Sequence, residues 1–408
     1  MKAKPSRTLD RALKGDLCTG CGACAAAAPG AIVMETAAPG YNRPRQVGPV
    51  PDERERVIAA VCPGSIVEPW PEAPNLDPYW GPWKRVATGW ATDLALRYRA
   101  SSGGVLTGLA VHALKSGLVD RVVHVASDPE RPSRNRVVCS TSEAEVIEGA
   151  GSRYAASSPL AVMDKVLSDG GRVAFIGKPC DASALRRLAR LDERVDQHIA
   201  FVLTFFCAGV PSHAAADRAI TAMGMDPAQV VHFRYRGFGW PGVTVAEDGD
   251  GRRVDMTYAE SWGRYLAEEV QFRCKICPDA VGGVADIACG DAWYSDARGY
   301  PSFEERDGRS LILSRTEVGE TLLRSAIEAG AIDARPLVVR EIDSMQPSQA
   351  RRKRLVRSRL AALSMTLQPR PDVRGTEVRT AARRASAGEQ IKSFLGAVHR
   401  ILWSRRRR

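Results

Sequence analysis

Three cysteines near the N-terminus, Cys18, Cys21 and Cys24, follow one another at three-residue spacing with small residues between them. Thiolates at this spacing on a tightly turning backbone can bind neighbouring corners of one iron-sulfur cluster, and glycines let backbone N–H groups approach its sulfurs. In bacterial ferredoxins a further cysteine follows after three residues and ligates the second cluster. Here that position is Ala28. The fourth ligand is therefore expected from a distant cysteine followed by proline, and Cys62 fits that pattern.

A zinc knuckle or a set of structural thiols is the alternative for this first group. Zinc sites usually pair two CxxC units across a loop, whereas here the third cysteine repeats the spacing of the first two. The pattern favours one 4Fe-4S cluster. Such a cluster holds electrons, so other parts of the chain are expected to show where they go.

A second group of cysteines is spread along the chain. Cys180 and Cys207 each come just after a predicted apolar strand, and Cys274 and Cys277 form a CxxC unit followed by proline. Ligands gather at the carboxyl ends of such strands. We expect these four thiolates to bind a second 4Fe-4S cluster. Zinc would accept the same thiolates and is the alternative metal.

The last two of the ten cysteines fit these groups less well. Cys289 competes for the fourth position of the second group. Cys139 lies apart from the ligand-type patterns, and we expect it to be an inert, packed thiol.

Two glycine-flanked polar turns are candidates for binding an anion. The first runs into a helix predicted over residues 105–114, and free N–H groups at a helix start favour a phosphate. An ordinary N-cap with a tight turn explains this segment equally well. The residues of the two turns are Ser101, Ser102, Gly103, Gly104, Gly151, Ser152, Arg153 and Tyr154.

Strands that alternate with helices must position these groups, and this alternation favours an α/β fold with a mixed sheet core. Strands are predicted over residues 119–125, 171–177, 199–206 and 309–313. We expect four parts: a ferredoxin-like 4Fe-4S domain, a linker rich in proline and tryptophan, an α/β domain and a basic helical tail. Their boundaries are residues 1–70, 71–84, 85–340 and 341–408.

The composition sets broad limits. The chain has 408 residues, 44% of them hydrophobic, which is enough for a substantial core and more than one domain. Cysteines grouped in ligand patterns indicate a reducing compartment. No run of about 18 apolar residues and no signal peptide is visible, so we expect a cytoplasmic protein.

The net charge of +11 is concentrated in the tail. No nucleic-acid-binding motif accompanies it, and we expect no nucleic acid partner. Residues 391–402 place apolar side chains on one helical face with basic residues beside it. Such a helix could lie on an anionic membrane surface or dock on an acidic partner, and packing back on the protein is the alternative.

Taken together, the motifs resemble the beta subunits of coenzyme F420-reducing hydrogenases and formate dehydrogenases. A plant 7-hydroxymethyl chlorophyll reductase and a ferredoxin-dependent divinyl chlorophyllide reductase are similar to this family. The resemblance extends over about residues 15–300. In chain order its motifs are CxxCxxC, CPG, SSGG, GSRY, GKPC, FFCAGVPS, FRYRG, CxxCP and ADIxxGD.

This resemblance implies FAD and iron-sulfur clusters, with Ser101–Gly104 and Gly151–Tyr154 as flavin contacts. Lys178, two residues before Cys180, could stabilise a reduced anionic flavin or an anionic substrate, and a surface lysine is the alternative. The expected function is to pass electrons from ferredoxin or a partner subunit through the clusters to FAD and a small-molecule acceptor. The alternative is an electron-transfer subunit with no substrate chemistry of its own.

Overall fold

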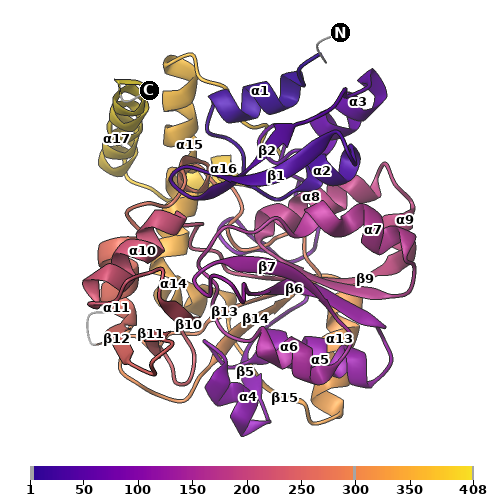
Figure 1. Ribbon diagram of the computed structural model, residues 1–408, viewed down its shortest axis with the longest axis vertical. Coiled ribbons are helices and arrows are strands. Elements are labelled where there is room, and N and C mark those ends of the chain that lie inside the picture. The colour runs from indigo at the N-terminus through magenta and orange to yellow at the C-terminus, as the bar shows by residue number, and fades with distance from the viewer. Residues whose placement is uncertain (1–3, 297–299, 407–408) are drawn as a thin grey trace.

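A mixed sheet of eight strands forms the centre of the computed structural model, which describes residues 4–296 and 300–406 (Figure 1). β6, β8, β9 and β13 run parallel, and antiparallel strands extend the sheet on both sides. The predicted mixed α/β architecture is confirmed. In spatial order the strands are β15 (Ile332–Pro336), β5 (Arg85–Ala91), β14 (Ser310–Ser314), β13 (Ile287–Asp291), β9 (Ile199–Phe205), β8 (Val173–Gly177), β6 (Arg121–Ser127) and β7 (Asn135–Ser140).

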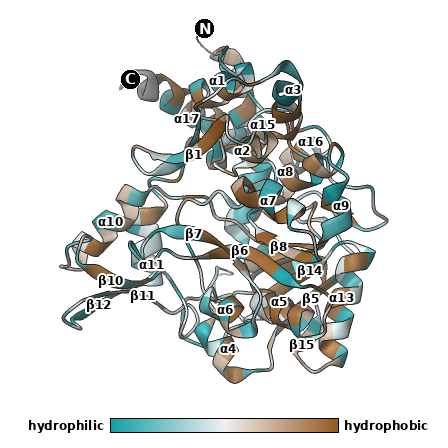
Figure 2. Cartoon of the chain, turned by 45° about the vertical axis from the view of Figure 1, so that its right-hand side comes forward, coloured by the Kyte–Doolittle hydropathy of each residue, from teal (hydrophilic) through white to brown (hydrophobic). Residues whose placement is uncertain are grey.

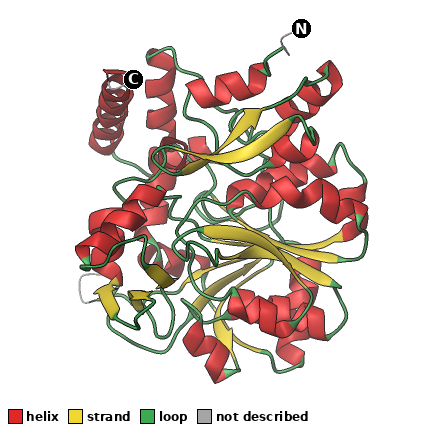
Figure 3. Ribbon diagram, in the orientation of Figure 1, coloured by secondary structure: helices red, strands yellow, loops and turns green. Residues whose placement is uncertain are grey.

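Helices cover both faces of this sheet, as Figures 1 and 3 show. The alternation of side chains along β8 explains the arrangement: Val173 and Phe175 join one hydrophobic cluster, and Ala174 joins the other. The hydrophobic strands lie between the two helical layers (Figure 2). One layer has α5 (Val105–Lys115), α6 (Glu143–Glu148) and α13 (Glu317–Glu328), and the other has α7 (Met163–Ser168), α8 (Pro179–Ala189) and α9 (Arg194–His198).

The N-terminal part packs closely on this body. Gly22, in the cysteine loop, has φ of 90°, and a Cβ atom there would lie 2.5 Å from the backbone nitrogen of Ala161. The Leu160 N–H donates to the carbonyl of Cys21, and the Ser158 hydroxyl donates to that of Gly20. The elements of this part are α1 (Arg7–Lys14), α2 (Ala23–Ala27), β1 (Ile32–Ala37), β2 (Tyr41–Gln46) and α3 (Asp52–Val61).

The linker rich in tryptophan runs across the body. Trp80 is buried, stacks on Phe206 with ring centroids 6.0 Å apart, and donates its indole N–H to Asp343. This stacking places the linker next to Cys207, the residue that follows Phe206. The linker contains β3 (Leu76–Asp77) and β4 (Gly81–Pro82).

A smaller sheet and several short helices flank the main sheet (Figure 3). They connect β9 to β13 and carry the CxxC unit, which begins in α12. These elements are α10 (His213–Ala222), β10 (Val230–Arg234), β11 (Val243–Asp248), β12 (Arg253–Thr257), α11 (Tyr258–Glu260), η2 (Ser261–Leu266) and α12 (Phe272–Lys275). Shorter elements elsewhere are α4 (Leu94–Arg99), η1 (Pro159–Val162), η3 (Val339–Glu341) and α14 (Ile342–Met345).

The C-terminal helices are α15 (Pro347–Met365), α16 (Val378–Ala382) and α17 (Ala387–Arg406). α15 buries Val356 in a cluster shared with Leu17 and Ile276, so it packs between the two cysteine-bearing segments. The predicted apolar face of α17 is divided. Ile401 is buried against this cluster, whereas Ile391, Leu395 and Leu402 are exposed. Within the described residues, none of the helices combines the length and apolarity that a membrane crossing requires.

Asp286 joins the central strands at the beginning of β13. Its carboxylate accepts hydrogen bonds from the Val202 N–H at 2.7 Å, the Thr316 hydroxyl at 2.7 Å and the Arg186 guanidinium at 2.8 Å, and it is buried. Asp286→Ala should therefore lower the free energy of unfolding by about 3 kcal/mol or more, since a hydrogen bond to a charged group contributes about 1.5–3 kcal/mol. Urea unfolding followed by circular dichroism measures this loss.

Asp333→Ala is the matched control for that experiment. Asp333 is more exposed, and its carboxylate lies 3.9 Å from the Arg335 guanidinium. Exposed pairs of this kind contribute about 0–1 kcal/mol. Equal losses in the two variants would contradict the role assigned to Asp286.

Candidate functional site

The first cysteine group lies where the two N-terminal helices α2 and α3 meet. Cys18 and Cys21 precede α2, Cys24 lies within it, and Cys62 follows α3. Burial raises the pKa of the Cys24 thiol, and the neighbouring Cys21, Cys18 and Cys62 raise it further. The Gly20 N–H donates to the Cys18 sulfur at 3.4 Å. The structure thus brings the four predicted residues together.

The second group is brought together in the same way. Cys180 lies in the first turn of α8, Cys207 just after β9, Cys274 in α12, and Cys277 in the loop beyond it. Burial, together with Cys274 and Cys277, raises the pKa of the Cys207 thiol to about 12. Burial, Asp181, Cys207 and Cys274 raise the pKa of the Cys180 thiol. Residues from three separate segments therefore form one group of thiols.

The proximity of the thiols does not by itself show that they bind a metal. Within residues 4–296 and 300–406, no three histidine, cysteine, aspartate or glutamate side chains stand in metal-ligating geometry. The structure therefore supports the two groups as neighbours, and binding of a metal by either group stays a prediction.

The two remaining cysteines are separate from these groups. Burial alone raises the pKa of Cys289 in β13 to about 12, with no contribution from the other thiols. Cys139, expected to be packed, is instead exposed. It lies on β7, the edge strand of the sheet, and Ser140 is the one buried residue of that strand.

Gln271 connects the two groups. Its side-chain N–H group donates to the carbonyl of Thr19, in the first cysteine loop, at 3.4 Å, and to the Cys274 sulfur at 3.5 Å. Its oxygen accepts from Arg43, whose guanidinium also interacts with Cys18. Gln271 is 3% exposed, so this connection is shielded from water.

A second connection runs beside it. The buried Arg273 guanidinium donates to the carbonyl of Pro63 at 2.9 Å, next to Cys62. Burial raises the pKa of the Cys277 thiol, and Arg273 opposes that rise. Arg273 therefore contacts the loop of the first group and places a positive charge near the second group.

A cavity of about 740 Å³ opens at the carboxyl ends of the parallel strands β8, β9 and β13. This is the edge at which α/β sheets collect ligands, and the volume is in the range of pockets for organic molecules. Its walls contain most residues of both predicted turns, together with Lys178, Cys207 and Cys274. The predicted flavin contacts and the second cysteine group thus border the same space.

The first turn is held against the sheet. The Ser102 hydroxyl donates to the carbonyl of Arg309 at 3.0 Å, and the Gly103 N–H donates to the Ser310 hydroxyl at 3.0 Å. A Cβ atom on Gly103 would lie 2.5 Å from the carbonyl of Gly89. Gly103 therefore packs behind the turn and is not part of the cavity wall.

The start of α5 faces the cavity. Gly104, with φ of 77°, turns the chain into the helix, and Val105, Leu106 and Thr107 line the wall. Within the described residues, the N–H groups of these three residues have no hydrogen-bond acceptor. Open N–H groups at a helix start favour an anionic group such as a phosphate.

The second turn lies beside the first, since the Ser152 hydroxyl donates to the Ser101 hydroxyl at 2.7 Å. Tyr154 packs against Trp262 with ring centroids 5.0 Å apart. The Arg153 guanidinium donates to the Asn135 side chain and to nearby backbone carbonyls, so it holds the loop.

Lys178 is buried, which excludes the surface-lysine alternative. Its ammonium group lies 2.8 Å from an oxygen of Asp181 and donates to the Ser157 hydroxyl at 3.0 Å. Burial lowers the pKa of Lys178, but the charges of Asp181 and Cys180 raise it by more. The side chain therefore stays cationic beside the cavity.

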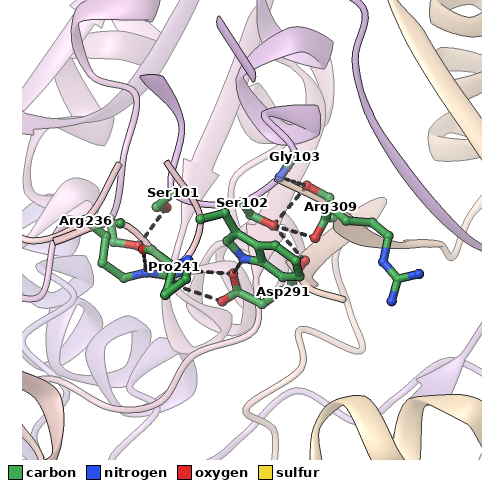
Figure 4. A network of polar contacts seen from close by, with 12 residues as sticks. Ser101, Ser102, Gly103, Arg236, Pro241, Asp291 and Arg309 are labelled. Atoms are coloured by element: carbon green, nitrogen blue, oxygen red, sulfur yellow. Dashed lines mark hydrogen bonds and ion pairs between the residues drawn. The ribbon is translucent and has the colours of Figure 1, made fainter. Parts of the chain in front are cut away.

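A buried ion pair on the cavity wall was not predicted. Arg236 and Asp291 form two parallel hydrogen bonds of 2.9 and 3.0 Å beside the Ser101–Gly103 turn (Figure 4). The Arg236 guanidinium lies 4.5 Å from the ring centre of Tyr258 and 5.1 Å from that of Trp293. Arg236 lies in the motif FRYRG, and Asp291 lies in the motif ADIxxGD. These motifs supported the family resemblance but predicted no role for either residue.

Helix α15 also contributes to the wall of the cavity. Arg352 donates to the carbonyl of Cys207 at 2.8 Å, and Gln349 donates to the same oxygen at 3.1 Å. Arg359 donates to the carbonyl of Lys275 at 2.5 Å. The basic charge of this segment indicated nothing about these contacts, because they depend on how α15 packs.

Known proteins with similar sequences are redox enzymes or subunits of redox enzymes. The beta subunit of coenzyme F420 hydrogenase from Methanococcus voltae is 25% identical over 65% of this chain and 88% of that protein. The chloroplastic 7-hydroxymethyl chlorophyll a reductase from Oryza sativa is 26% identical over 58% of this chain and 48% of that protein.

A solved structure shares the fold. A chain of the F420-reducing [NiFe] hydrogenase complex from Methanosarcina barkeri matches with a TM-score of 0.53 and 22% identity, over 67% of this chain and 91% of that chain. Two family models, the N-terminal and C-terminal parts of the coenzyme F420 hydrogenase/dehydrogenase beta subunit, match residues 86–164 and 170–339. Together they span more than half of the sequence, and the chain therefore belongs to the coenzyme F420 hydrogenase/dehydrogenase beta subunit family, a family of oxidoreductase subunits.

Proposed function

We propose that the protein is an iron-sulfur flavoprotein that passes electrons from ferredoxin or another redox partner through two 4Fe-4S clusters to FAD and on to a small-molecule acceptor. One observation carries this proposal. Cys207 and Cys274 of the second group line the same cavity as most of the predicted flavin contacts, while Gln271 links that cysteine group to the first.

The thiols suit iron-sulfur clusters. Each group has four cysteines, the number of thiolates that a 4Fe-4S cluster takes. Arg43 near Cys18 and Arg352 near Cys207 supply positive charge, and backbone N–H groups approach the sulfurs of the first group. Cys18, Cys21, Cys24 and Cys62 would hold one cluster, and Cys180, Cys207, Cys274 and Cys277 the other.

The cavity suits a dinucleotide flavin. The open N–H groups at the start of α5 would bind a phosphate, and Tyr258, Trp262 and Trp293 offer aromatic surfaces on the wall. Bound FAD would convert between the single electrons of the clusters and two-electron reduction of an organic acceptor. Lys178 keeps a positive charge beside the cavity, which favours negative charge that develops there.

A second function is favoured by the relatives that are subunits of larger enzymes. In this alternative the chain only transfers electrons, and the chemistry occurs on another polypeptide. Turnover of a reducible acceptor by the purified chain would support the first function over the second.

Iron analysis tests the two clusters. The anaerobically reconstituted chain should contain about eight iron atoms, as two cubanes require, and Cys207→Ala should contain about four, since it removes a ligand of one cluster. Cys289→Ala is the matched control and should keep the full amount, because Cys289 lies apart from the second group. About four iron atoms with one zinc in the unmodified chain would refute the second cluster.

A charge placed at the start of α5 tests the flavin site. Thr107→Glu should weaken FAD binding by about tenfold or more, because a carboxylate would repel the phosphate and a charged hydrogen bond is worth about 1.5–3 kcal/mol. Thr107→Gln, similar in size and neutral, is the control. Fluorescence of released flavin measures the content, and equal FAD content in both variants would contradict the site.

Removal of the Gln271 hydrogen bond tests the connection between the groups. Gln271→Leu should lower the reduction potential of the second cluster by about 20–60 mV, because a hydrogen bond to sulfur stabilises the more negative reduced state and is worth about 0.5–1.5 kcal/mol. A redox titration followed by EPR measures the potential. Gln390→Leu is the control. The Gln390 side chain donates hydrogen bonds to the carbonyls of Arg354 and Ala382 in the C-terminal segment, so its removal should leave the reduction potential unchanged. Identical potentials in both variants would count against the contact.

A further inference from the structure

One part of the cavity wall carries positive charge that no carboxylate neutralises. Asp181 and Asp291 are the two carboxylates of the described wall, and each is already paired, with Lys178 and Arg236 respectively. The cations of this unpaired group are Lys275, Arg351, Arg352 and Arg359. Within the described residues, none of these four forms an ion pair.

The hydrogen bonds of Arg352 and Arg359 do not neutralise this positive charge. Arg352 donates to the neutral carbonyls of Cys207 and Ala208, and Arg359 donates to the carbonyl of Lys275 and the Ser393 hydroxyl. A carbonyl or a hydroxyl satisfies a donor without cancelling the charge of the guanidinium. The fold therefore orients Arg352 and Arg359 while their positive charge stays available.

Like charges held together are costly for the fold. Burial, together with the charges of Arg400, Arg352 and Arg351, lowers the pKa of Arg359 to about 10. The nearest carboxylate on the adjacent helix, Glu389, pairs with Arg354 at 2.7 Å and is only weakly influenced by Arg351. A bound anion would relieve this repulsion.

The second cysteine group accounts for part of the charge. Arg352 opposes the rise in pKa of Cys207 and of Cys277, so its charge acts on those thiols. Arg351 is not among the main influences on the pKa of either thiol, and Arg359 contacts the backbone of Lys275 and not a sulfur. These two arginines are therefore left for a different ligand.

We infer that Arg351 and Arg359, together with Lys275, bind a phosphate or carboxylate group of the small-molecule acceptor, so that the acceptor is an organic anion. This inference deepens the proposed function and rests on it for the identity of the ligand as acceptor. Both arginines lie on α15, beyond residue 339, where the matched family models end. The C-terminal segment thus adds a recognition element to the cavity shared by the family.

A binding experiment with inorganic pyrophosphate tests this site without knowledge of the acceptor. The reconstituted full chain should bind pyrophosphate in isothermal titration calorimetry, with an affinity that falls as salt rises. Arg351→Gln and Arg359→Gln should each weaken binding by about tenfold or more, as loss of a charged hydrogen bond implies. Arg357→Gln is the matched control, since Arg357 is an exposed arginine of α15 outside the cavity wall.

The outcomes separate this inference from the proposed function. Flavin and iron contents are measured on the same samples, and circular dichroism checks folding. Arg351 is exposed and makes no hydrogen bond that supports the fold within the described residues, so its variant should fold normally. If the chain carries iron and FAD but binds no pyrophosphate, or binds it equally in all variants, the anion site is refuted alone.

Two further results are decisive. If the Arg351 and Arg359 variants lose FAD together with pyrophosphate, these arginines belong to the phosphates of the cofactor and the acceptor site is refuted. If the unmodified chain takes up neither iron nor flavin, the proposed function fails, whereas salt-dependent pyrophosphate binding lost in the two variants would still support an anion site.

Discussion

Eight thiols gathered in two groups impose the main constraint on this structure. A thiolate out of water is unfavourable unless positive charge, hydrogen bonds or a metal stabilises it, and burial raises the pKa of thiols in both groups. Guanidinium groups from distant segments supply positive charge to these thiols: Arg43 near Cys18, and Arg273 and Arg352 near the second group. The N-terminal part, the connection between β9 and β13 and the C-terminal helix are thereby packed around one region.

This constraint gives the C-terminal segment a structural role. The segment was predicted to be a basic helical tail, and in the structure α15 buries Val356 beside Leu17 and Ile276, which lie next to the two cysteine groups. Lys353 is buried as well and donates to the carbonyl of Pro278. A segment that satisfies these carbonyls and shares this hydrophobic cluster acts as a cover for the cysteine loops. Exposed apolar residues remain on α17, on the side away from this contact.

The sequence allowed prediction of features that depend on local spacing. The CxxCxxC loop, the CxxC unit, the strands at β8 and β9, and the polar turn before α5 each follow from residues close together in the chain, and the mixed sheet was expected on the same basis. The Arg236–Asp291 pair could not be predicted, because its residues are 55 positions apart and meet only through the packing of the smaller sheet on the main one. Cys139 was wrongly predicted to be packed. Its neighbours in the sequence are hydrophobic, but they did not reveal that its strand forms an edge of the sheet.

The positions of Gln271 and the cavity also restrict the order in which electrons can move. Gln271 touches the first cysteine loop and Cys274, whereas the cavity wall includes Cys207 and Cys274 and none of the first group. In the proposed relay, the first cluster would therefore lie on the side of the partner protein, and the second would lie next to the flavin. A donor that docked near the cavity would bypass the first group and leave its four thiols without a role. The connection through Gln271 is thus better explained if electrons enter at the N-terminal part and leave through the cavity.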